Sequence, residues 1–273
     1  MLFLAFLSFL VPFPFVNAQE SKPPGAASTT PKKPDYDDYG YYKKYGRTGK
    51  AWNDFVKNGF EAYDSQDCEK TIANLKQAIG AGCNDSLVYF KLGACSELTG
   101  SYYSAIQYYK QSEDGLKTLS APHRYQKDFY EAYGRALYMS KKLDEAMPYL
   151  IKAGEVGAPS YALYFLLGQI YLSKGDNPNA LNYFNKAIAQ PLDMANPAQL
   201  GIIYGSIGKA YLEAKDIEKA IQYLDMALKQ TPTDNDIQQA RIRAGDMKRQ
   251  QEIFKMMQGL SNDSSKPVYP VSH

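Results

Sequence analysis

The chain has 273 residues, enough for one or two domains, and a formal net charge of +2 from 31 Lys and Arg against 29 Asp and Glu. A charge so close to balance creates no basic or acidic field, which disfavours nucleic acid and anionic membrane surfaces as partners. Tyrosine is abundant, with 24 residues against one tryptophan, and it suits packing between helices because the ring is buried while the hydroxyl stays in water.

Residues 1–18 differ in composition from the rest of the chain. Met1 to Val11 is an apolar run, and Val16-x-Ala18 resembles a signal-peptidase site with cleavage before Gln19. The run is shorter than the roughly 20 apolar residues that cross a membrane. We therefore expect a signal peptide and an exported protein, located in the periplasm, at the cell surface or secreted, with no membrane span after cleavage. No Lys or Arg precedes the run, so an uncleaved anchor or a misassigned start codon remains the alternative.

Residues 19–50 have the composition of a linker. The first part is rich in Pro, Ser and Thr and cannot form a core, which predicts disorder. A tract that begins at Asp35 then carries five tyrosines between Tyr36 and Tyr45. These rings either pack on the first folded unit or form a segment that recruits a partner or folds into the protein's own groove.

A pattern of small and large residues recurs five times between residues 51 and 235. Its internal glycines are Gly59, Gly93, Gly134, Gly168 and Gly208, at separations of about 34, 41, 34 and 40 residues. The clearest copy has Gly168, Ala180 and Ala187 as small residues, with Leu167 and Phe184 as large ones. Small residues allow two helices to cross closely, and Gly175 followed by Asp176 suits a turn between them. The pattern predicts helix pairs that stack because one pair cannot bury its apolar face alone.

These motifs resemble those of the tetratricopeptide repeat family over about residues 52–235. The resemblance implies an all-α, right-handed superhelical solenoid of about five helix-turn-helix units plus a C-terminal capping helix. The units are expected at about 52–85, 86–119, 127–160, 161–194 and 201–234, with extra residues near 114–126 and 190–199. We expect residues 235–258 to form the cap, because Ile237, Ala240, Ala244, Met247 and Phe254 make an apolar stripe opposite basic residues. Residues 259–273 are expected to be a disordered tail.

The residues do not favour catalysis, a metal or a cofactor. The two histidines, His123 and His273, and three scattered cysteines give no zinc-ligand spacing. The segment from Gly205 to Lys209 lacks the spacing of a phosphate-binding loop and falls inside an expected helix. We therefore expect no enzyme activity, no cofactor and no metal site.

The cysteines permit one disulfide. Cys68 and Cys83 are expected at opposite ends of a helix that spans roughly 20 Å, too far for a bond. Cys95 is expected near the same end as Cys68. An oxidising compartment then predicts a Cys68–Cys95 bridge. Three buried or half-buried thiols are the equally weighted alternative.

In the family that the chain resembles, the first helix of each unit lines the concave face. The corresponding positions here lack the Lys, Asn and Arg clamp with which co-chaperones of the family hold a carboxylate tail, and they carry apolar and aromatic residues instead. Such a face suits an amphipathic helix or an extended peptide with apolar anchors. The alternative is that neighbouring helices or the Tyr-rich tract cover this face. The expected partner-binding residues are Phe60, Tyr63, Phe90, Leu98, Arg135, Tyr138, Phe165, Gln169, Leu172 and Lys209.

The favoured function is a non-catalytic scaffold that binds a protein or peptide partner in the assembly or tethering of a cell-envelope complex. A self-associating structural envelope protein and a regulatory subunit of an enzyme complex are the alternatives.

Overall fold

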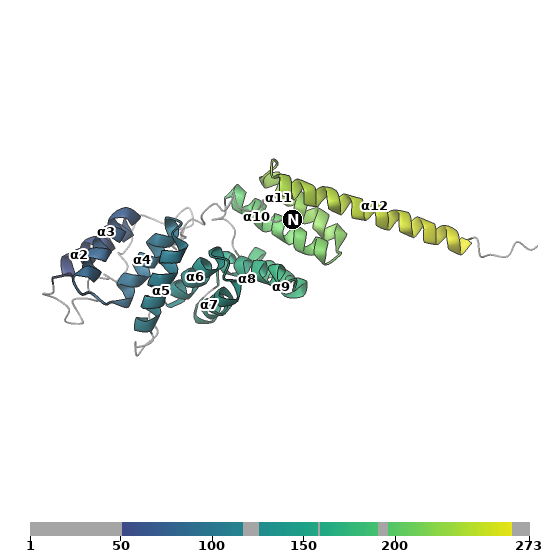
Figure 1. Ribbon diagram of the computed structural model, residues 1–273. Helices are drawn as coiled ribbons and strands as arrows, with labels where there is room; N and C mark the ends of the chain where they lie inside the picture. The colour runs from purple at the N-terminus through teal and green to yellow at the C-terminus, as the bar shows by residue number, and fades with distance from the viewer. Residues whose placement is uncertain (1–50, 117–125, 158, 191–195, 264–273) are drawn as a thin grey trace, which may run out of the picture. The chain divides into compact units, whose positions relative to one another are not determined.

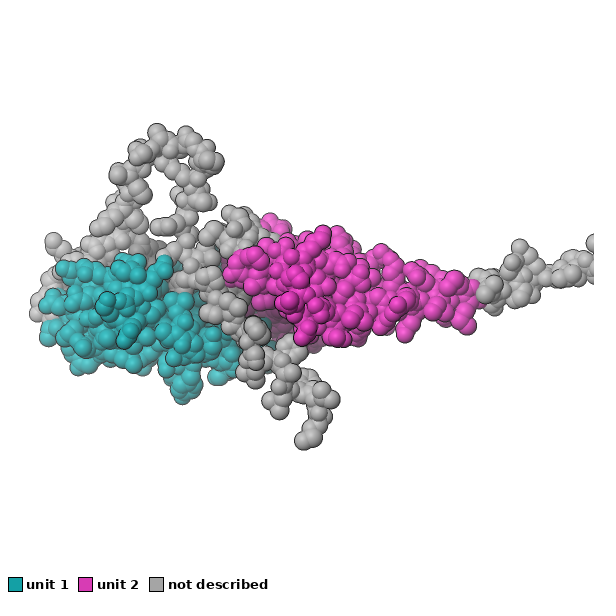
Figure 2. Space-filling model, turned by 90° about the horizontal axis from the view of Figure 1, so that it is seen from above, with its two compact units in different colours: residues 1–158 teal, residues 159–273 magenta. Residues whose placement is uncertain are grey.

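The structure is a computed structural model that describes residues 51–116, 126–157, 159–190 and 196–263 (Figure 1). The expected signal peptide, the linker, His123 and the tail beyond residue 263 lie outside the described residues. The chain divides into two compact units, Met1–Ala158 and Pro159–His273 (Figure 2), and each is described by itself. In the described ranges, no helix is both long enough and apolar enough to span a membrane.

The described part of unit 1 consists of three antiparallel helix pairs. These are α2 (Asn53–Asp64) with α3 (Cys68–Gly80), α4 (Ser86–Leu98) with α5 (Tyr102–Leu116), and α6 (Gln126–Met139) with α7 (Leu143–Val156). Each first helix also lies against the second helix of the preceding pair, α4 against α3 and α6 against α5. Buried apolar side chains therefore pack both within the pairs and between successive pairs.

The described part of unit 2 has two further pairs and a long final helix. Helix α8 (Tyr161–Ser173) pairs with α9 (Asn177–Ile188), and α10 (Pro197–Glu213) pairs with α11 (Ile217–Gln230). Helix α12 (Asn235–Asp263) then lies against α11 and α10, as α10 lies against α9 and α8. The expected all-α array of about five helix-turn-helix units followed by a C-terminal helix is confirmed. The right-handed superhelical winding stays a prediction.

The cap is longer than the expected 235–258. Helix α12 continues to Asp263, so residues 259–263 are helical rather than part of a disordered tail. Gly259 and the polar residues after it favour a helix end locally. This local preference is weaker than the stabilisation from extending an existing helix, in which each added residue forms one more hydrogen bond.

The repeated glycines allow the two helices of a pair to approach closely. A Cβ added at Gly134 would lie 2.7 Å from Leu150 Cγ, and one at Gly168 would lie 2.5 Å from Phe184 Cδ1. Leu150 and Phe184 are fully buried. The small residue on the first helix thus faces a large residue on the second, which is the arrangement that the sequence pattern predicts.

The turns inside the pairs share one backbone conformation. A single residue with positive φ connects the helices, and it is glycine in two turns, with Gly175 at 75° and Gly100 at 76°. The other three turns use Gln66, Lys141 and Lys215, at 61°, 64° and 61°. These three residues adopt the left-handed conformation at an energetic cost that glycine does not incur.

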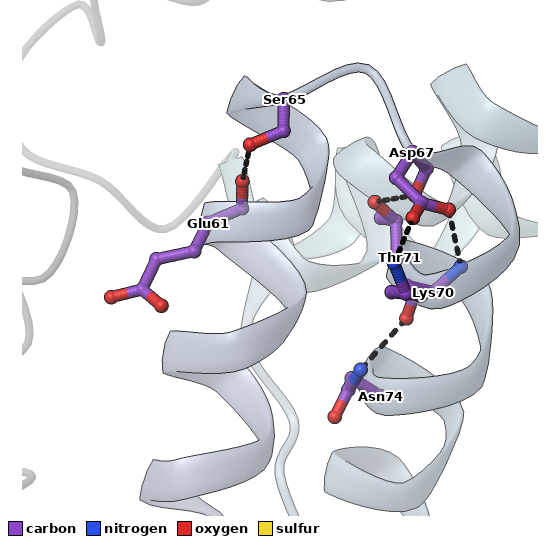
Figure 3. Close-up of polar contacts among 6 residues, drawn as sticks. All are labelled: Glu61, Ser65, Asp67, Lys70, Thr71 and Asn74. Carbon is purple, nitrogen blue, oxygen red and sulfur yellow. Dashed lines mark hydrogen bonds and ion pairs between the residues drawn. The ribbon is translucent and has the colours of Figure 1, made fainter.

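Aspartate side chains cap three of the second helices, α3, α9 and α11, directly after these turns. In the first turn, Asp67 accepts a 3.0 Å hydrogen bond from the backbone N–H of Lys70 (Figure 3). The Asp67 carboxylate also forms an ion pair with the ammonium group of Lys70. The Thr71 hydroxyl donates to the Asp67 carbonyl in the same turn. Asp176 and Asp216 cap α9 and α11 in the same way. A cap of this kind contributes about 1 kcal/mol because it satisfies an N–H that otherwise has no partner in the helix.

Candidate partner-binding site

The ten expected partner-binding residues all lie on first helices of the pairs, as the resemblance implied. They fall in two sets. The set in unit 1 is on α2, α4 and α6, and the set in unit 2 is on α8 and α10. Each set is therefore a candidate site of its own. The unit 1 set is Phe60, Tyr63, Phe90, Leu98, Arg135 and Tyr138, and the unit 2 set is Phe165, Gln169, Leu172 and Lys209.

Three of the expected anchors are buried. The exposed fractions of Phe60, Phe90 and Phe165 are 4%, 5% and 3%. The Phe90 ring lies 6.1 Å from that of Tyr109, and the Phe165 ring lies 5.7 Å from that of Phe184. The expectation that these rings lie exposed on a groove is wrong, because side chains of the protein itself already surround them.

An ionic cluster joins the first helices of the second and third pairs in unit 1. Arg135 on α6 donates from Nε and Nη2 to the two carboxylate oxygens of Glu97 on α4. The Tyr109 hydroxyl on α5 donates to Glu97 Oε2 at 3.0 Å. The three groups come from three helices, so the cluster fixes the spacing of α4 and α6 on this face. Of these three residues, only Arg135 is among the expected partner-binding residues.

Burial perturbs the ionisation of this cluster. Desolvation raises the pKa of Tyr109 well above its usual value, and the nearby Glu97 charge raises it further. Burial alone lowers the pKa of Arg135, but the charge and hydrogen bonds of Glu97, with smaller effects of Tyr109 and Glu131, raise the net pKa above its usual value. Arg135 is therefore a charged structural link, held by Glu97, as well as a potential contact for a ligand.

A second cation is buried between α2 and α4. Lys91 is 2% exposed, and its Nζ lies 4.0 Å from the centre of the Tyr63 ring and 4.7 Å from that of Phe60. Asp64 lies 3.8 Å from the same nitrogen. The aromatic faces and the carboxylate offset the desolvation of the ammonium. Sequence reasoning missed Lys91, since lysine is ordinarily exposed.

The expected residues that keep exposed surface in unit 1 lie beside these two clusters. Leu98 is 37% exposed and follows Glu97 directly. Tyr138 is half-buried and lies one helical turn after Arg135, and burial raises its pKa. Tyr63 is half-buried next to Lys91. These three side chains place apolar surface next to a rigid ionic framework.

In unit 2 the expected polar residues are engaged with their own unit. Gln169 Nε2 donates to Ser206 Oγ at 2.8 Å, which links α8 to α10. Lys209 forms an ion pair with Asp236 at the start of α12. Leu172 is half-buried. These contacts tie successive pairs together, so the unit 2 set offers a partner less apolar surface than the unit 1 set.

The three cysteines are free thiols, and Cys68 and Cys95 lie near one another. Cys68 begins α3, and Cys95 is buried in α4. Burial raises the pKa of the Cys95 thiol, and the nearby Cys68 thiol raises it further. Cys83 is buried after the end of α3. The proximity of Cys68 and Cys95 fits the expected pairing, and the bond itself stays a prediction.

We expect oxidised glutathione to join Cys68 and Cys95, with two electrons passing to the glutathione disulfide. The bridge closes a loop of about 27 residues (95 − 68) and is expected to stabilise unit 1 by about 3 kcal/mol. The raised pKa of Cys95 means that the reaction is faster at alkaline pH. Non-reducing peptide mapping detects the bridge, and denaturation with and without reductant measures the stabilisation. Cys83→Ser is the matched control. Three free thiols after oxidation would contradict the prediction.

Comparisons with known proteins identify the fold. Residues 171–242 match the family model for the tetratricopeptide repeat. A search of curated protein sequences found no significant match. Among solved structures, MamA is similar at 23% identity and a TM-score of 0.54, over 67% of this chain and 93% of that chain.

Two further solved structures share the fold. YrrB, described as a TPR protein with an unusual peptide-binding site, has 17% identity and a TM-score of 0.57, over 74% of this chain and 97% of that chain. The C-terminal part of a TPR repeat-containing protein from Cytophaga hutchinsonii has 17% identity and a TM-score of 0.54, over 72% of each chain.

Proposed function

The chain carries tetratricopeptide repeats and has their fold, and we propose that it is a non-catalytic scaffold that holds a partner polypeptide on the first helices of unit 1. Proteins of this fold serve as binding surfaces. The observation that carries the proposal is the face formed by α4 and α6, where Glu97 and Arg135 fix two neighbouring helices. Leu98 and Tyr138 leave apolar surface exposed beside that link.

The chemistry of this face indicates the kind of partner. Leu98, Tyr63 and Tyr138 offer short apolar and aromatic contacts, whereas the ionic groups among them are already paired within the chain. A segment with apolar anchors, either helical or extended, fits such a face better than a strongly charged tail. YrrB, which shares the fold, is described by its peptide-binding site, and this supports a peptide as the ligand class.

We also propose that the protein acts outside the cytoplasm, in the assembly or tethering of an envelope complex. The support is the apolar run from Met1 and the Val16-x-Ala18 pattern. Expression of the full chain with a C-terminal tag, followed by fractionation and N-terminal sequencing, tests this part. A mature chain that begins at Gln19 is expected, and an intact Met1 in the cytoplasmic fraction would contradict it.

A photocrosslinking amino acid at position 98 is expected to capture a partner segment in the native envelope. Tyr103, on α5 and 77% exposed, is the matched control position because it lies on the second helix of the same pair. We expect Leu98→Asp to lower partner recovery at least tenfold while the melting temperature stays within about 2 °C, since Leu98 is already partly in water. Tyr103→Asp is expected to leave recovery unchanged. Equal recovery with both variants would exclude the face formed by α4 and α6.

A further inference from the structure

Helix α12 has two halves with different environments. The first half packs on α11, with Ile237 and Ala244 buried. Arg241 Nε lies 2.6 Å from Asp225, and Lys248 Nζ lies 2.9 Å from Glu218. Glu218 is at the beginning of α11, so α12 runs antiparallel to α11 and reaches its far end at Lys248.

The second half of α12 extends past its support. Every residue from 249 to 258 is exposed. The helix continues to Asp263, which carries it about 22 Å beyond Lys248 at 1.5 Å per residue. Figure 1 shows α12 running past α11, and Figure 2 shows the same narrow extension of unit 2.

One face of α12 carries an apolar stripe that α11 does not cover. The exposed fractions of Ile242, Ile253 and Met256 are 56%, 52% and 61%. Together with Asp246 and Arg249 they recur at alternating intervals of about four and three residues, the spacing of core positions in a coiled coil. Asp246 and Arg249 form an ion pair in the middle of the stripe. Met257 lies beside the stripe, whereas Phe254 projects from a different face.

The side of α12 near this stripe is also where a repeat unit would place its second helix. A Cβ at Gly208 of α10 would lie 2.6 Å from Leu224 Cγ of α11. A Cβ at Gly245 of α12 would meet only Arg241 Nη1, at 3.5 Å. Helix α12 thus lies like the first helix of a further unit, and no second helix covers Gly245 among the described residues.

We propose that α12 of a second copy of this chain covers the stripe in antiparallel orientation. Pairing about the midpoint between residues 247 and 248 places Ile242 against Ile253 of the second copy. It also places Asp246 against Arg249 of the second copy. The two-fold axis repeats both contacts, so these four positions are complementary to themselves in apolar character and in charge. Met256 faces Gln239 of the second copy, at the edge of the paired stripe.

The charge pattern selects the antiparallel arrangement. In a parallel pair in register, Asp246 would face Asp246 of the second copy and Arg249 would face Arg249, and like charges at core positions are unfavourable. In the antiparallel pair, each Asp246 faces Arg249 of the other copy, so both central contacts join opposite charges. Antiparallel pairing is also the relation between the two helices of each repeat unit, so the second copy supplies the missing helix in the orientation that the fold uses.

The expected dimer is weak. A single pair of helices of this length buries an area near the lower limit of stable interfaces, about 1,200 Å² in total. We expect a dissociation constant on the order of micromolar, with a monomer and dimer in exchange. This interface does not involve the face formed by α4 and α6, so either proposal can fail without the other.

Two single charge variants test the interface. Asp246→Arg alone places two arginines opposite each other, and Arg249→Asp alone does the same with two aspartates. We expect each variant to raise the dissociation constant at least tenfold in sedimentation equilibrium of the full chain. An equimolar mixture is expected to form a mixed dimer, because each Arg then faces an Asp. Gln251→Asp, which adds a negative charge on the opposite face of the same helix, is the control and is expected to dimerise normally.

Cysteine crosslinking tests the orientation. Ile242→Cys and Ile253→Cys are each exposed substitutions, and oxidation of their mixture is expected to give a disulfide between the two variants. Crosslinking of each variant with itself would indicate a parallel pair and would overturn the proposed register. The unmodified chain under the same conditions controls for the native cysteines. The proposal would be overturned if the chain stays monomeric at its highest soluble concentration. It would also be overturned if the chain floats with anionic vesicles and Ile253→Asp abolishes that flotation, because the stripe would then bind a membrane.

Discussion

Gly134→Val is expected to lower the free energy of unfolding of unit 1 by about 3 kcal/mol. The Cβ of any side chain at this position would lie 2.7 Å from Leu150 Cγ and 3.1 Å from the backbone N of Leu150. Leu150 is fully buried, and the backbone atom belongs to α7, so the clash is relieved only by separating α6 from α7. Chemical denaturation followed by circular dichroism measures the loss.

Gly80→Val is the matched control for this prediction. Gly80 is the last residue of α3, and a Cβ there would meet no atom within 4 Å. Its effect is expected to stay within about 0.5 kcal/mol. Similar losses in the two variants would show that helix propensity, and not the contact between α6 and α7, determines the cost.

Glu97→Leu is expected to lower the stability of unit 1 by about 3 kcal/mol because it leaves the Arg135 guanidinium without its carboxylate. Side-chain exposures of 7% for Glu97 and 19% for Arg135 mean that water replaces little of the lost interaction. The Tyr109 hydroxyl loses its acceptor at the same time. Replacing a whole buried pair by apolar residues is much less costly than breaking it.

The double variant Glu97→Leu/Arg135→Met is therefore expected to recover at least half of the lost stability. Denaturation of the two single variants and the double variant gives the coupling energy between the side chains. A coupling below about 0.5 kcal/mol would contradict the role assigned to this pair. Arg241→Met, which breaks a half-exposed ion pair with Asp225 on another helix, is a control with an expected cost below about 1 kcal/mol.

The helix pairs could be predicted from the sequence because their determinants are local. Gly168, Ala180 and Phe184 lie within one pair, and the spacing of small and large residues reports directly on the contact between its two helices. The turn at Gly175 was predicted for the same reason. The turns at Gln66, Lys141 and Lys215 have the same backbone without the glycine, so their sequences gave no signal of the left-handed conformation.

The exposed face of the first helices could not be predicted, because it depends on residues distant in the sequence. Helix α4 is buried around most of its circumference, from Leu87 to Glu97, since it contacts the helices before and after it as well as α5. An apolar pattern on such a helix does not distinguish a groove from a core, and Phe90 was misassigned for this reason. Lys91 shows the converse case: its burial depends on aromatic rings of α2.

The uncovered glycine of the last helix has a consequence for how this protein can change in evolution. Among the described residues, α12 lies like the first helix of a pair, with Gly245 in place to receive a bulky side chain from a second helix. Duplication of one helix-turn-helix segment at the carboxyl end could therefore lengthen the protein without redesign of the existing residues. The same property makes α12 a natural site for grafting an added hairpin in the laboratory.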